Sequence, residues 1–373
     1  MKICFVALNA YGVLAGKDNA HFGGAESQVQ LMSAWFKKRG HDVTVVVWDE
    51  GGPELEEIDG VRLIKFARRS DGFRVMRFFW PRWAYLNKAL RLADADLYIQ
   101  NCAEHTTGQI AIWCKRHRRR FVYLVASNAD CARPRESRGA YYNRWLFRYG
   151  LLNNSQVIAQ TNFQRDLLKT NYSISATTIP MAGTPKEHGT ALDEDERHSK
   201  RQVLWVGRIC RIKRIEMLLD VAQKMPDVTF NIVGKGDDDD SYVSTTISKI
   251  KAIPNVVYHG AVARGSMPAH YGRTCILCCT STLEGFPNVF LESWSHGNPV
   301  VSTFDPDGVI TSRRLGVAVK DSPEMVAAIK TLLSNRTRWV EFSKNATQYF
   351  ETNHLPDSVF TEYENIFKQI AAC

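Results

Sequence analysis

The sequence predicts an α/β protein made of two doubly wound domains. The chain has 373 residues. A single hydrophobic core rarely extends over that many residues, so two domains are expected. Short apolar runs alternate with helical stretches along the chain, which is typical of parallel sheets covered by helices on both faces. Glycines and charged residues follow several of these runs, at the sheet edge where doubly wound proteins bind ligands.

The composition is that of a soluble globular protein, with 45% hydrophobic and 23% charged residues. No apolar run reaches the length of about 18 residues that a membrane-spanning helix needs. The N-terminal run Lys2–Leu8 lacks a small-residue cleavage pattern, so we expect a strand and a cytoplasmic protein. The net charge of +9 favours an anionic partner, and nucleotide diphosphates, acidic lipid headgroups and nucleic acid all fit.

The cysteines indicate reduced thiols and no metal site. There are nine of them, scattered along the chain, and an odd number forms no complete disulfide framework. Cys275 and Cys278 have the spacing of a metal pair, but they lack a second pair and lie in an apolar run, where a free cysteine packs as a small hydrophobe.

The first half of the chain predicts one parallel sheet with its helices. We expect strands at Lys2–Leu8, Asp42–Trp48, Val61–Phe66, Asp96–Gln100, Phe121–Ala126, Gln156–Gln160 and Ala176–Pro180, and helices at Thr107–His117, Tyr141–Leu152 and Phe163–Lys169. A further helix begins at Gly23 and Gly24 after a polar loop. Free N–H groups and the positive end of the helix dipole favour a phosphate there, although a glycine cap would explain the same pair.

The second half repeats the pattern after the stretch 184–200, which contains a proline, a glycine and alternating charges and predicts a flexible linker. A strand from Val203 ends in Gly207, and Arg208 and Lys213 follow around a turn. Two cations at such an edge would hold a diphosphate, unless they are only solvated surface residues. The stretch 356–373 carries the apolar stripe of an amphipathic helix.

The most informative stretch is 280–301, which predicts a strand end, a loop, a helix and another strand. Glu284 lies on the loop and Glu292 on the helix, with seven residues between them. Gly285 allows close approach of a ligand, Pro287 suits a first helical position, and Gly297 ends the helix. Two carboxylates beside backbone N–H donors suit a polyhydroxylated, phosphate-bearing ligand. The alternative is a loop-helix junction with two surface glutamates.

Three motifs resemble those of the retaining glycosyltransferases of family 4. They are Glu284-Gly-Phe-Pro-Asn288 with Glu292, Val206-Gly-Arg208 with Lys213, and Gly23-Gly-Ala-Glu26. The resemblance implies the GT-B fold, in which two Rossmann-like domains face a central cleft. It also implies the domain limits 1–183 for an acceptor domain, 184–200 for a linker, 201–355 for a donor domain and 356–373 for a terminal helix that packs back on the first domain.

The resemblance also implies roles for individual residues. The carboxylate of Glu284 would contact hydroxyls of the donor sugar, Glu292 would contact the nucleotide ribose, and Arg208 and Lys213 would bind the diphosphate. Glu284, Arg208 and Lys213 are therefore the candidate catalytic residues. The other candidate donor-binding residues are Gly23, Gly24, Gly207, Gly234, Gly285, Phe286, Pro287 and Asn288. The donor would be a nucleotide diphosphate sugar, with no cofactor and no metal.

One position departs from the family. Many relatives have a histidine that contacts the donor sugar just after the strand predicted at Phe121–Ala126, and Ser127 occupies that place here. We consider Ser127, Asn128 and His105 as candidate sugar or acceptor contacts. A solvated loop histidine is the alternative for His105.

Two basic segments of the first domain suggest an anionic membrane surface as a partner. Arg68–Trp83 mixes arginines with aromatic residues, and Lys115–Arg120 is a dense cationic cluster. A partly buried helix and a helix C-terminus that attracts cations are the respective alternatives. We expect a peripheral enzyme on the inner face of the cytoplasmic membrane that uses a glycan or lipid-linked glycan in cell-surface polysaccharide or lipopolysaccharide synthesis.

Three other functions fit parts of the sequence. A sugar-nucleotide epimerase can share the GT-B fold. A nicotinamide-dependent oxidoreductase would need a Gly-x-Gly-x-x-Gly motif after a strand, which is absent. A non-enzymatic anion or nucleic-acid binder would explain the charge, but the sequence contains no recognisable DNA- or RNA-binding module, and we expect no nucleic-acid partner.

Overall fold

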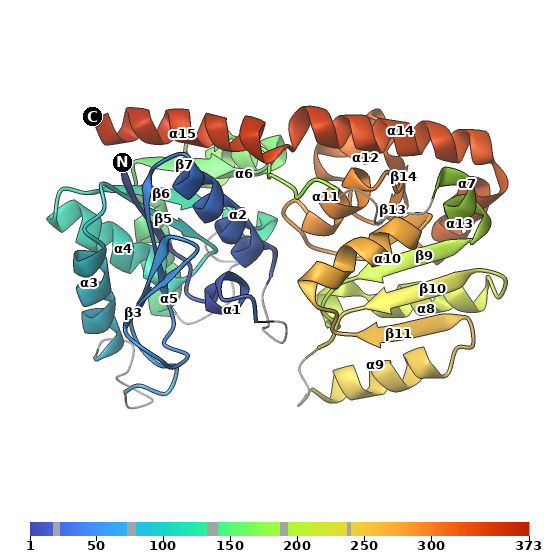
Figure 1. Cartoon of the computed structure of the whole chain (residues 1–373), viewed down its shortest axis with the longest axis horizontal. Helices are drawn as coiled ribbons and strands as arrows, with labels where there is room; N and C mark the ends of the chain where they lie inside the picture. Colours follow the sequence, from blue (N-terminus) through green and yellow to red (C-terminus); the bar gives the residue numbers. More distant parts are fainter. Residues whose placement is uncertain (18–22, 73–79, 133–140, 187–192, 237–239, 373) are drawn as a thin grey trace. The chain divides into compact units, whose positions relative to one another are not determined.

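The computed structural model divides the chain into two compact units. The first comprises Met1–Ala182 with Pro356–Cys373, and the second comprises Gly183–Leu355. The structure describes residues 1–17, 23–72, 80–132, 141–186, 193–236 and 240–372. Each unit is built on one mainly parallel sheet with helices (Figure 1). The predicted α/β fold with two doubly wound sheets is confirmed.

The first sheet has the strand order β3-β4-β2-β1-β5-β6-β7-β8. Its strands are β1 (Lys2–Val6), β2 (Asp42–Val47), β3 (Leu55–Ile58), β4 (Val61–Lys65), β5 (Leu97–Asn101), β6 (Arg120–Leu124), β7 (Gln156–Ala159) and β8 (Thr177–Thr178). All neighbours pair in parallel except β3 and β4. The sequence did not predict β3, because this short edge strand carries two glutamates and none of its residues is buried.

Helices cover both faces of this sheet. They are α1 (Tyr11–Leu14), α2 (Gly24–Lys38), α3 (Arg82–Ala93), α4 (His105–Arg116), α5 (Tyr141–Leu152), α6 (Asn162–Tyr172) and α15 (Pro356–Ala372), with a 3-10 turn, η1, at Asn128–Cys131. α2 and α15 share one buried core with the sheet, whereas α3, α4 and α5 share the other. Among the described helices, none combines the length and apolar content of a bilayer span.

The second sheet has the order β11-β10-β9-β12-β13-β14, and its neighbours all pair in parallel. Its strands are β9 (Gln202–Val206), β10 (Thr229–Val233), β11 (Val256–Gly260), β12 (Ile276–Cys279), β13 (Val300–Ser302) and β14 (Gly316–Ala318). Since β9 lies between β10 and β12, the loops that follow these three strands begin at one edge of the sheet.

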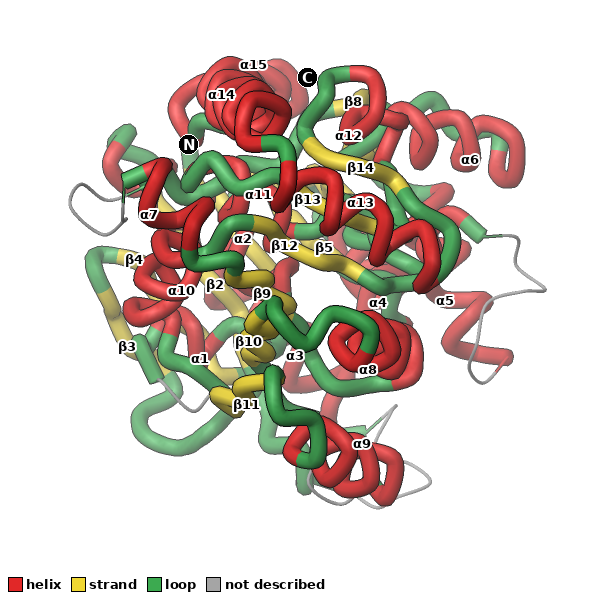
Figure 2. The backbone as a smooth tube through the Cα atoms, turned by 90° about the vertical axis from the view of Figure 1, so that its right-hand side faces the viewer, coloured by secondary structure: helices red, strands yellow, loops and turns green. Residues whose placement is uncertain are grey.

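The helices of the second unit also lie on both faces of its sheet. They are α7 (Glu194–Ser199), α8 (Ile215–Gln223), α9 (Ser241–Lys251), α10 (Met267–Arg273), α11 (Asn288–Ser295), α12 (Val309–Ser312), α13 (Ser322–Ser334) and α14 (Arg336–Asn353), with 3-10 turns η2 (Arg211–Lys213), η3 (Arg264–Ser266) and η4 (Pro306–Gly308). Figure 2 shows the strands between α8 and α13 on one side and α10 and α11 on the other.

The stretch 184–200 contains a packed helix where we expected a flexible linker. Its residues 194–199 form α7, and the side chain of Asp193 caps this helix by accepting a bond from the Glu196 N–H group at 2.7 Å. Arg197 is only 4% exposed and donates to the carbonyl of His296 at 2.6 Å and to Asn298 at 2.8 Å. The run of charges therefore contains a helix start with acids in its first turn, which favours helix formation.

The C-terminal helix α15 belongs to the first unit and packs against α2. The rings of Phe36 and Phe367 stack with 5.5 Å between their centroids. The indole N–H of Trp35 donates to Asp357 at 2.7 Å. The buried Glu364 carboxylate accepts bonds from His41 at 2.7 Å, and from Arg39 and Lys368.

These bonds change the pKa of Glu364. Burial alone would raise it, but the hydrogen bonds from His41, Lys368 and Arg39 outweigh burial and lower the pKa to about 2. A carboxyl whose pKa is depressed by folding stabilises the fold above its unfolded pKa, which is about 4.3 for glutamate. This contribution is lost as the pH falls from there to about 2.

We predict that Glu364→Gln lowers the free energy of unfolding by about 1.5–3 kcal/mol at neutral pH, because it weakens charge-assisted bonds in a buried site. The loss should shrink below pH 4, where the wild-type carboxyl also becomes protonated. Urea unfolding followed by circular dichroism measures both effects. Glu362→Gln, on the exposed side of the same helix, is the control, and equal losses for the two variants would contradict the account.

Candidate functional site

The loops after β9 and β10 are joined by backbone hydrogen bonds at the edge of the second sheet. The N–H group of Gly207 donates to the carbonyl of Val233 at 3.1 Å, and that of Ile209 donates to the carbonyl of Lys235 at 3.1 Å. Parallel pairing of the strands therefore continues into the loops. These bonds fix the position of the backbone on both sides of Arg208, where the cationic segment begins.

Gly234 allows this close approach of the two loops. Its φ angle is +134°, a conformation that favours glycine. A Cβ atom at this position would lie 1.9 Å from the carbonyl oxygen of Gly207. Gly234 is therefore needed to pack the loop itself, and its expected contact with the donor stays a prediction.

Thr280 connects the end of β12 to the turn after β9. Its hydroxyl donates to the carbonyl of Lys213 at 2.5 Å and accepts from the indole N–H of Trp205 at 3.1 Å. The N–H group of Thr282 adds a bond to the carbonyl of Ile212 at 3.0 Å. Two side chains and two loops thus form one hydrogen-bonded junction. The sequence did not mark Thr280, whose partners are distant in the chain.

This junction brings together two of the predicted catalytic residues. Lys213 donates to a carboxylate oxygen of Glu284, and their side chains are 26% and 14% exposed. Arg208 is exposed, and its guanidinium makes no ion pair or hydrogen bond with the residues that the structure describes. The loop after β9 therefore presents two cations and the loop after β12 a carboxylate, a set that suits a sugar diphosphate.

Glu292 is held by a residue that the sequence motifs did not indicate. The hydroxyl of Tyr271, on α10, donates to a carboxylate oxygen of Glu292 at 2.6 Å. Burial raises the pKa of Glu292, and the Tyr271 bond and the Arg264 charge oppose that rise. Tyr271 is only 1% exposed, so it fixes the carboxylate and leaves the second oxygen for another donor.

The residues between the two glutamates mainly build the loop. Phe286 is buried, and its ring lies 6.0 Å from that of Trp294 and 5.3 Å from that of His354. Pro287, expected at the first helical position, is instead the N-cap, and α11 begins at Asn288. Gly285 is buried. Any contact of Phe286 with a donor would therefore come from its backbone.

In the first unit, the start of α2 differs from our expectation. Gly23 is the N-cap and Gly24 the first helical residue, as the sequence indicated. However, the N–H group of Gly23 donates to the carboxylate of Glu26 at 2.8 Å. This N–H group is therefore occupied by a side chain of the same motif, and an anion would have to displace that carboxylate to bind there.

Ser127, Asn128 and His105 follow the neighbouring strands β6 and β5. The hydroxyl of Ser127 accepts a bond from the N–H group of Ala129 at 3.2 Å. The carbonyl oxygen of Asn128 accepts from Gln164 at 3.1 Å. His105 begins α4, and burial together with the nearby Arg82 lowers its pKa. Ser127 and Asn128 thus each accept one hydrogen bond that helps to shape the loop after β6.

Asp130, beside them, is a buried acid that the motifs did not assign. Burial raises its pKa to about 6, although it accepts bonds from the N–H group of Ala126 at 2.9 Å and from the hydroxyl of Tyr123 at 3.1 Å. It therefore supports the β6 loop and carries a proton more readily than an exposed aspartate.

The predicted site residues are divided between the units. Gly23, Gly24, His105, Ser127 and Asn128 belong to the first, and the remaining candidates belong to the second. Within the described residues there is no group of three or more histidines, cysteines or acids suited to a metal ion. The expected independence of metal stays a prediction.

Two family models match the chain. The model described as "Glycosyltransferase Family 4" matches residues 22–182, and the model described as "Glycosyl transferases group 1" matches residues 200–335. Together they include every predicted site residue.

Two curated relatives match parts of the chain. A stretch of 113 residues is 33% identical to a Klebsiella pneumoniae protein described as uncharacterized and encoded in a cps region, over 30% of this chain and 29% of the relative. A Haemophilus influenzae protein described as an uncharacterized glycosyltransferase is 25% identical over 56% of this chain and 58% of its own. The matches span less than two thirds of either relative.

Solved structures share the fold of the whole chain. Sucrose-phosphate synthase from Thermosynechococcus elongatus has a TM-score of 0.79 and 16% identity over 99% of both chains. HepE of Anabaena, solved with UDP-glucose, has a TM-score of 0.77 and 17% identity over 99% of this chain and 100% of its own. WaaG, described as a glycosyltransferase involved in lipopolysaccharide biosynthesis, has a TM-score of 0.69 and 14% identity over 95% of this chain and 98% of its own.

We predict that Gly234→Ala disrupts the junction of the β9 and β10 loops, because its Cβ would overlap the Gly207 carbonyl. Overpacking of this kind costs about 1–3 kcal/mol, which thermal unfolding of the variant would report. Gly265→Ala is the control, since no atom lies within 4 Å of a Cβ there. A Gly234→Ala variant as stable as Gly265→Ala would show that the loops can separate freely.

Proposed function

Because the chain belongs to glycosyltransferase family 4, we propose that it transfers a sugar from a nucleotide diphosphate sugar with retention of configuration at the anomeric carbon. The observation that carries this proposal is the junction in which Thr280 places Lys213 against Glu284. It puts a cation and a carboxylate side by side at the edge where parallel sheets bind ligands.

The cations would bind and stabilise the diphosphate. Breaking the bond between sugar and phosphate leaves negative charge on the departing nucleotide. Arg208, whose guanidinium is exposed, and Lys213 would contact this charge without the help of a metal. Since Lys213 already pairs with Glu284, its side chain needs little rearrangement to donate a second bond to a phosphate oxygen.

The two carboxylates would orient the rest of the donor. Glu284 would accept bonds from sugar hydroxyls beside the diphosphate. Glu292 would accept a bond from a ribose hydroxyl through the oxygen that Tyr271 does not occupy. Tyr271 is thus a positioning residue for the nucleotide, and its bond keeps the carboxylate in one orientation before the donor arrives.

The relatives suggest the donor and pathway. HepE was solved with UDP-glucose, which makes a UDP-sugar the first donor to test. WaaG is described as acting in lipopolysaccharide biosynthesis, and one relative is encoded in a cps region. We therefore propose a glycan or lipid-linked glycan acceptor in cell-surface polysaccharide or lipopolysaccharide synthesis. The candidate acceptor contacts are Ser127, Asn128 and His105.

A lipid-linked acceptor implies work at the cytoplasmic face of a membrane. Of the segment Arg68–Trp83 proposed as a contact, residues 73–79 lie outside the described structure, and Trp80 is 66% exposed. In the second segment, Lys115–Arg120, residues 115–118 are exposed. Cations near an anionic leaflet contribute about 1 kcal/mol each, which supports reversible peripheral binding.

We predict that Arg208→Ala and Lys213→Ala each reduce sugar transfer about ten- to a hundredfold, because each removes a charge-assisted contact of about 1.5–3 kcal/mol to the diphosphate. The assay measures transfer to a cell-surface glycan preparation in the presence of EDTA, and release of free nucleotide or of an isomerised sugar nucleotide is recorded separately.

Arg211→Ala is the matched control, since Arg211 lies in the same turn but packs over the ring of Tyr242 at 4.6 Å. Its transfer rate should stay near that of the wild type. Wild-type rates in both Arg208→Ala and Lys213→Ala would rule out the assigned site, and an isomerised sugar nucleotide as the main product would favour an epimerase.

A further inference from the structure

A groove of about 370 Å³ lies between α3 and α4 on the first unit. From α3 it is lined by Trp83, Asn87 and Arg91, which follow one another at intervals of four residues along one helix face. This stripe is about 12 Å long, given a rise of 1.5 Å per residue. The groove is therefore an elongated site at the lower end of the size range of small-molecule pockets.

The α4 side contributes a second arginine and a histidine to the groove. Ile112 and Trp113 give it an apolar wall, and Arg116 and His117 follow at the C-terminal end of the helix. Arg91 lies in the last turn of α3. The lining thus combines two arginines near the C-terminal ends of α3 and α4 with the apolar side chains of Trp83, Ile112 and Trp113.

The two arginines have no charged partner in the described chain. Neither Arg91 nor Arg116 makes an ion pair or a side-chain hydrogen bond with a described residue. Other arginines of the same unit do, such as Arg119, which donates to Asp94 at 2.7 Å. As far as the described residues go, the groove therefore concentrates positive charge that no acid pairs with.

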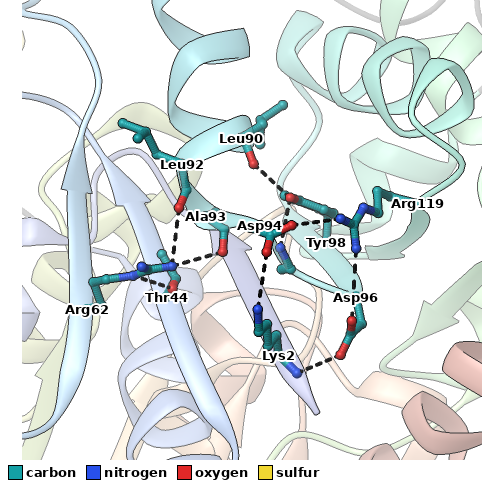
Figure 3. Close-up of polar contacts among 11 residues, drawn as sticks. Lys2, Thr44, Arg62, Leu90, Leu92, Ala93, Asp94, Asp96, Tyr98 and Arg119 are labelled. Atoms are coloured by element: carbon teal, nitrogen blue, oxygen red, sulfur yellow. Dashed lines mark hydrogen bonds and ion pairs between the residues drawn. The ribbon is translucent and has the colours of Figure 1, made fainter.

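The acids closest in sequence to Arg91 and Arg116 already bond to other residues. Figure 3 shows Asp94 between Lys2 and Arg119, and Asp96 accepting a bond from the backbone N–H group of Lys2. Arg62 donates to the carbonyl of Ala93 at 2.9 Å and so holds the end of α3 against the sheet. Asp94 and Asp96 are thus paired with Lys2 and Arg119, neither of which lines the groove.

Ring contacts and a hydrogen bond hold the wall of the groove in place near Trp113 and His117. The ring of Trp113 lies edge-on to that of Tyr98 with 5.0 Å between centroids, and the ring of His117 stacks on it with 4.3 Å between centroids. The hydroxyl of Tyr98 in turn donates to the carbonyl of Leu90 at 2.7 Å. An occupant would therefore meet preformed walls, which lowers the entropy cost of binding.

We propose that this groove binds the phosphate-bearing headgroup of an anionic membrane lipid. Arg91, Arg116 and His117 contact the phosphate, and the first carbons of the lipid lie along Ile112 and Trp83. This inference deepens the membrane partner of the proposed function and names the site and the chemistry that it recognises. It depends on the first unit alone.

The helix next to α4, α5, supports a lipid over a soluble phosphate ester. α5 contacts α4 and belongs to the same helical layer. Its side chains Tyr142, Trp145 and Leu152 are 47%, 53% and 47% exposed. Aromatic and apolar side chains beside cations are typical of surfaces that lie in the membrane interface.

Cations at helix C-termini also occur simply because they favour the helix dipole. That explanation predicts no bound ligand and no difference between cations that line the groove and neighbours that do not. Lys115 and Arg118 are such neighbours, since both are exposed and neither lines the groove. Both belong to the segment Lys115–Arg120, which would add to membrane binding through the field of an anionic leaflet, and that field is absent when the lipid is a dissolved monomer. In the titration with the short-chain lipid they therefore provide a comparison with the same change of charge.

The test is calorimetric titration of the full chain with dihexanoyl phosphatidic acid below its micelle concentration, with glycerol 3-phosphate, and with phosphatidylcholine vesicles with or without phosphatidic acid. We expect saturable binding of the short-chain lipid at one site per chain. Arg91→Gln with Arg116→Gln should weaken it roughly tenfold or more. Lys115→Gln with Arg118→Gln should change it less than about threefold, because charges outside the groove act only through the screened field.

Each other outcome would overturn a defined part of the proposal. Equal weakening in the two double variants, or no binding of the short-chain lipid, would remove the groove as a site. Glycerol 3-phosphate binding as tightly as the lipid would replace the membrane with a soluble phosphate ester. Binding of nucleotide sugars should be unchanged in both double variants, so a failure of the proposed donor site is detected separately.

Discussion

The proposed donor site depends on the hydrogen bonds of Thr280. Its hydroxyl bonds to the Lys213 carbonyl and to the Trp205 indole, so it joins the loop after β12 to the loop after β9. Thr280 is fully buried, and replacing it would leave buried polar groups without partners, which is costly. The positions of Lys213 and Glu284 both follow from this junction. The chemistry of the site is therefore set by core packing as much as by the charged residues themselves.

The sequence predicted the parts of this site that local structure controls. The spacing of Glu284 and Glu292 follows from a strand end, a glycine loop and a helix start, and all three carry short-range signals. Tyr271 and Thr280 were not predicted, because their partners, Glu292 and Lys213, are 21 and 67 residues away in the chain. Contacts of that kind depend on how strands are ordered in the sheet. The local patterns of a single sequence do not predict that order.

The errors have a similar origin. The charged stretch around Arg197 was expected to be flexible, but the buried partners that order α7 come from about 100 residues further along, at His296 and Asn298. At Gly23 the local motif was correct, but Glu26 occupies the N–H group that we had assigned to a phosphate, and the contact with the donor stays a prediction. The unpaired arginines of the α3 and α4 groove also became visible only when the ion pairs of their neighbours were known.

The central claim is that the second unit binds a nucleotide diphosphate sugar through Glu292, Lys213 and Arg208. The most direct measurement is calorimetric titration of the full chain with UDP-, GDP- and ADP-sugars and with the 2′-deoxyribose form of the nucleotide that binds best. We expect one of the three nucleotides to bind at one site per chain, and the deoxyribose form to bind more weakly, because Glu292 loses a ribose hydroxyl. Absence of binding by all three classes of nucleotide sugar would contradict the claim.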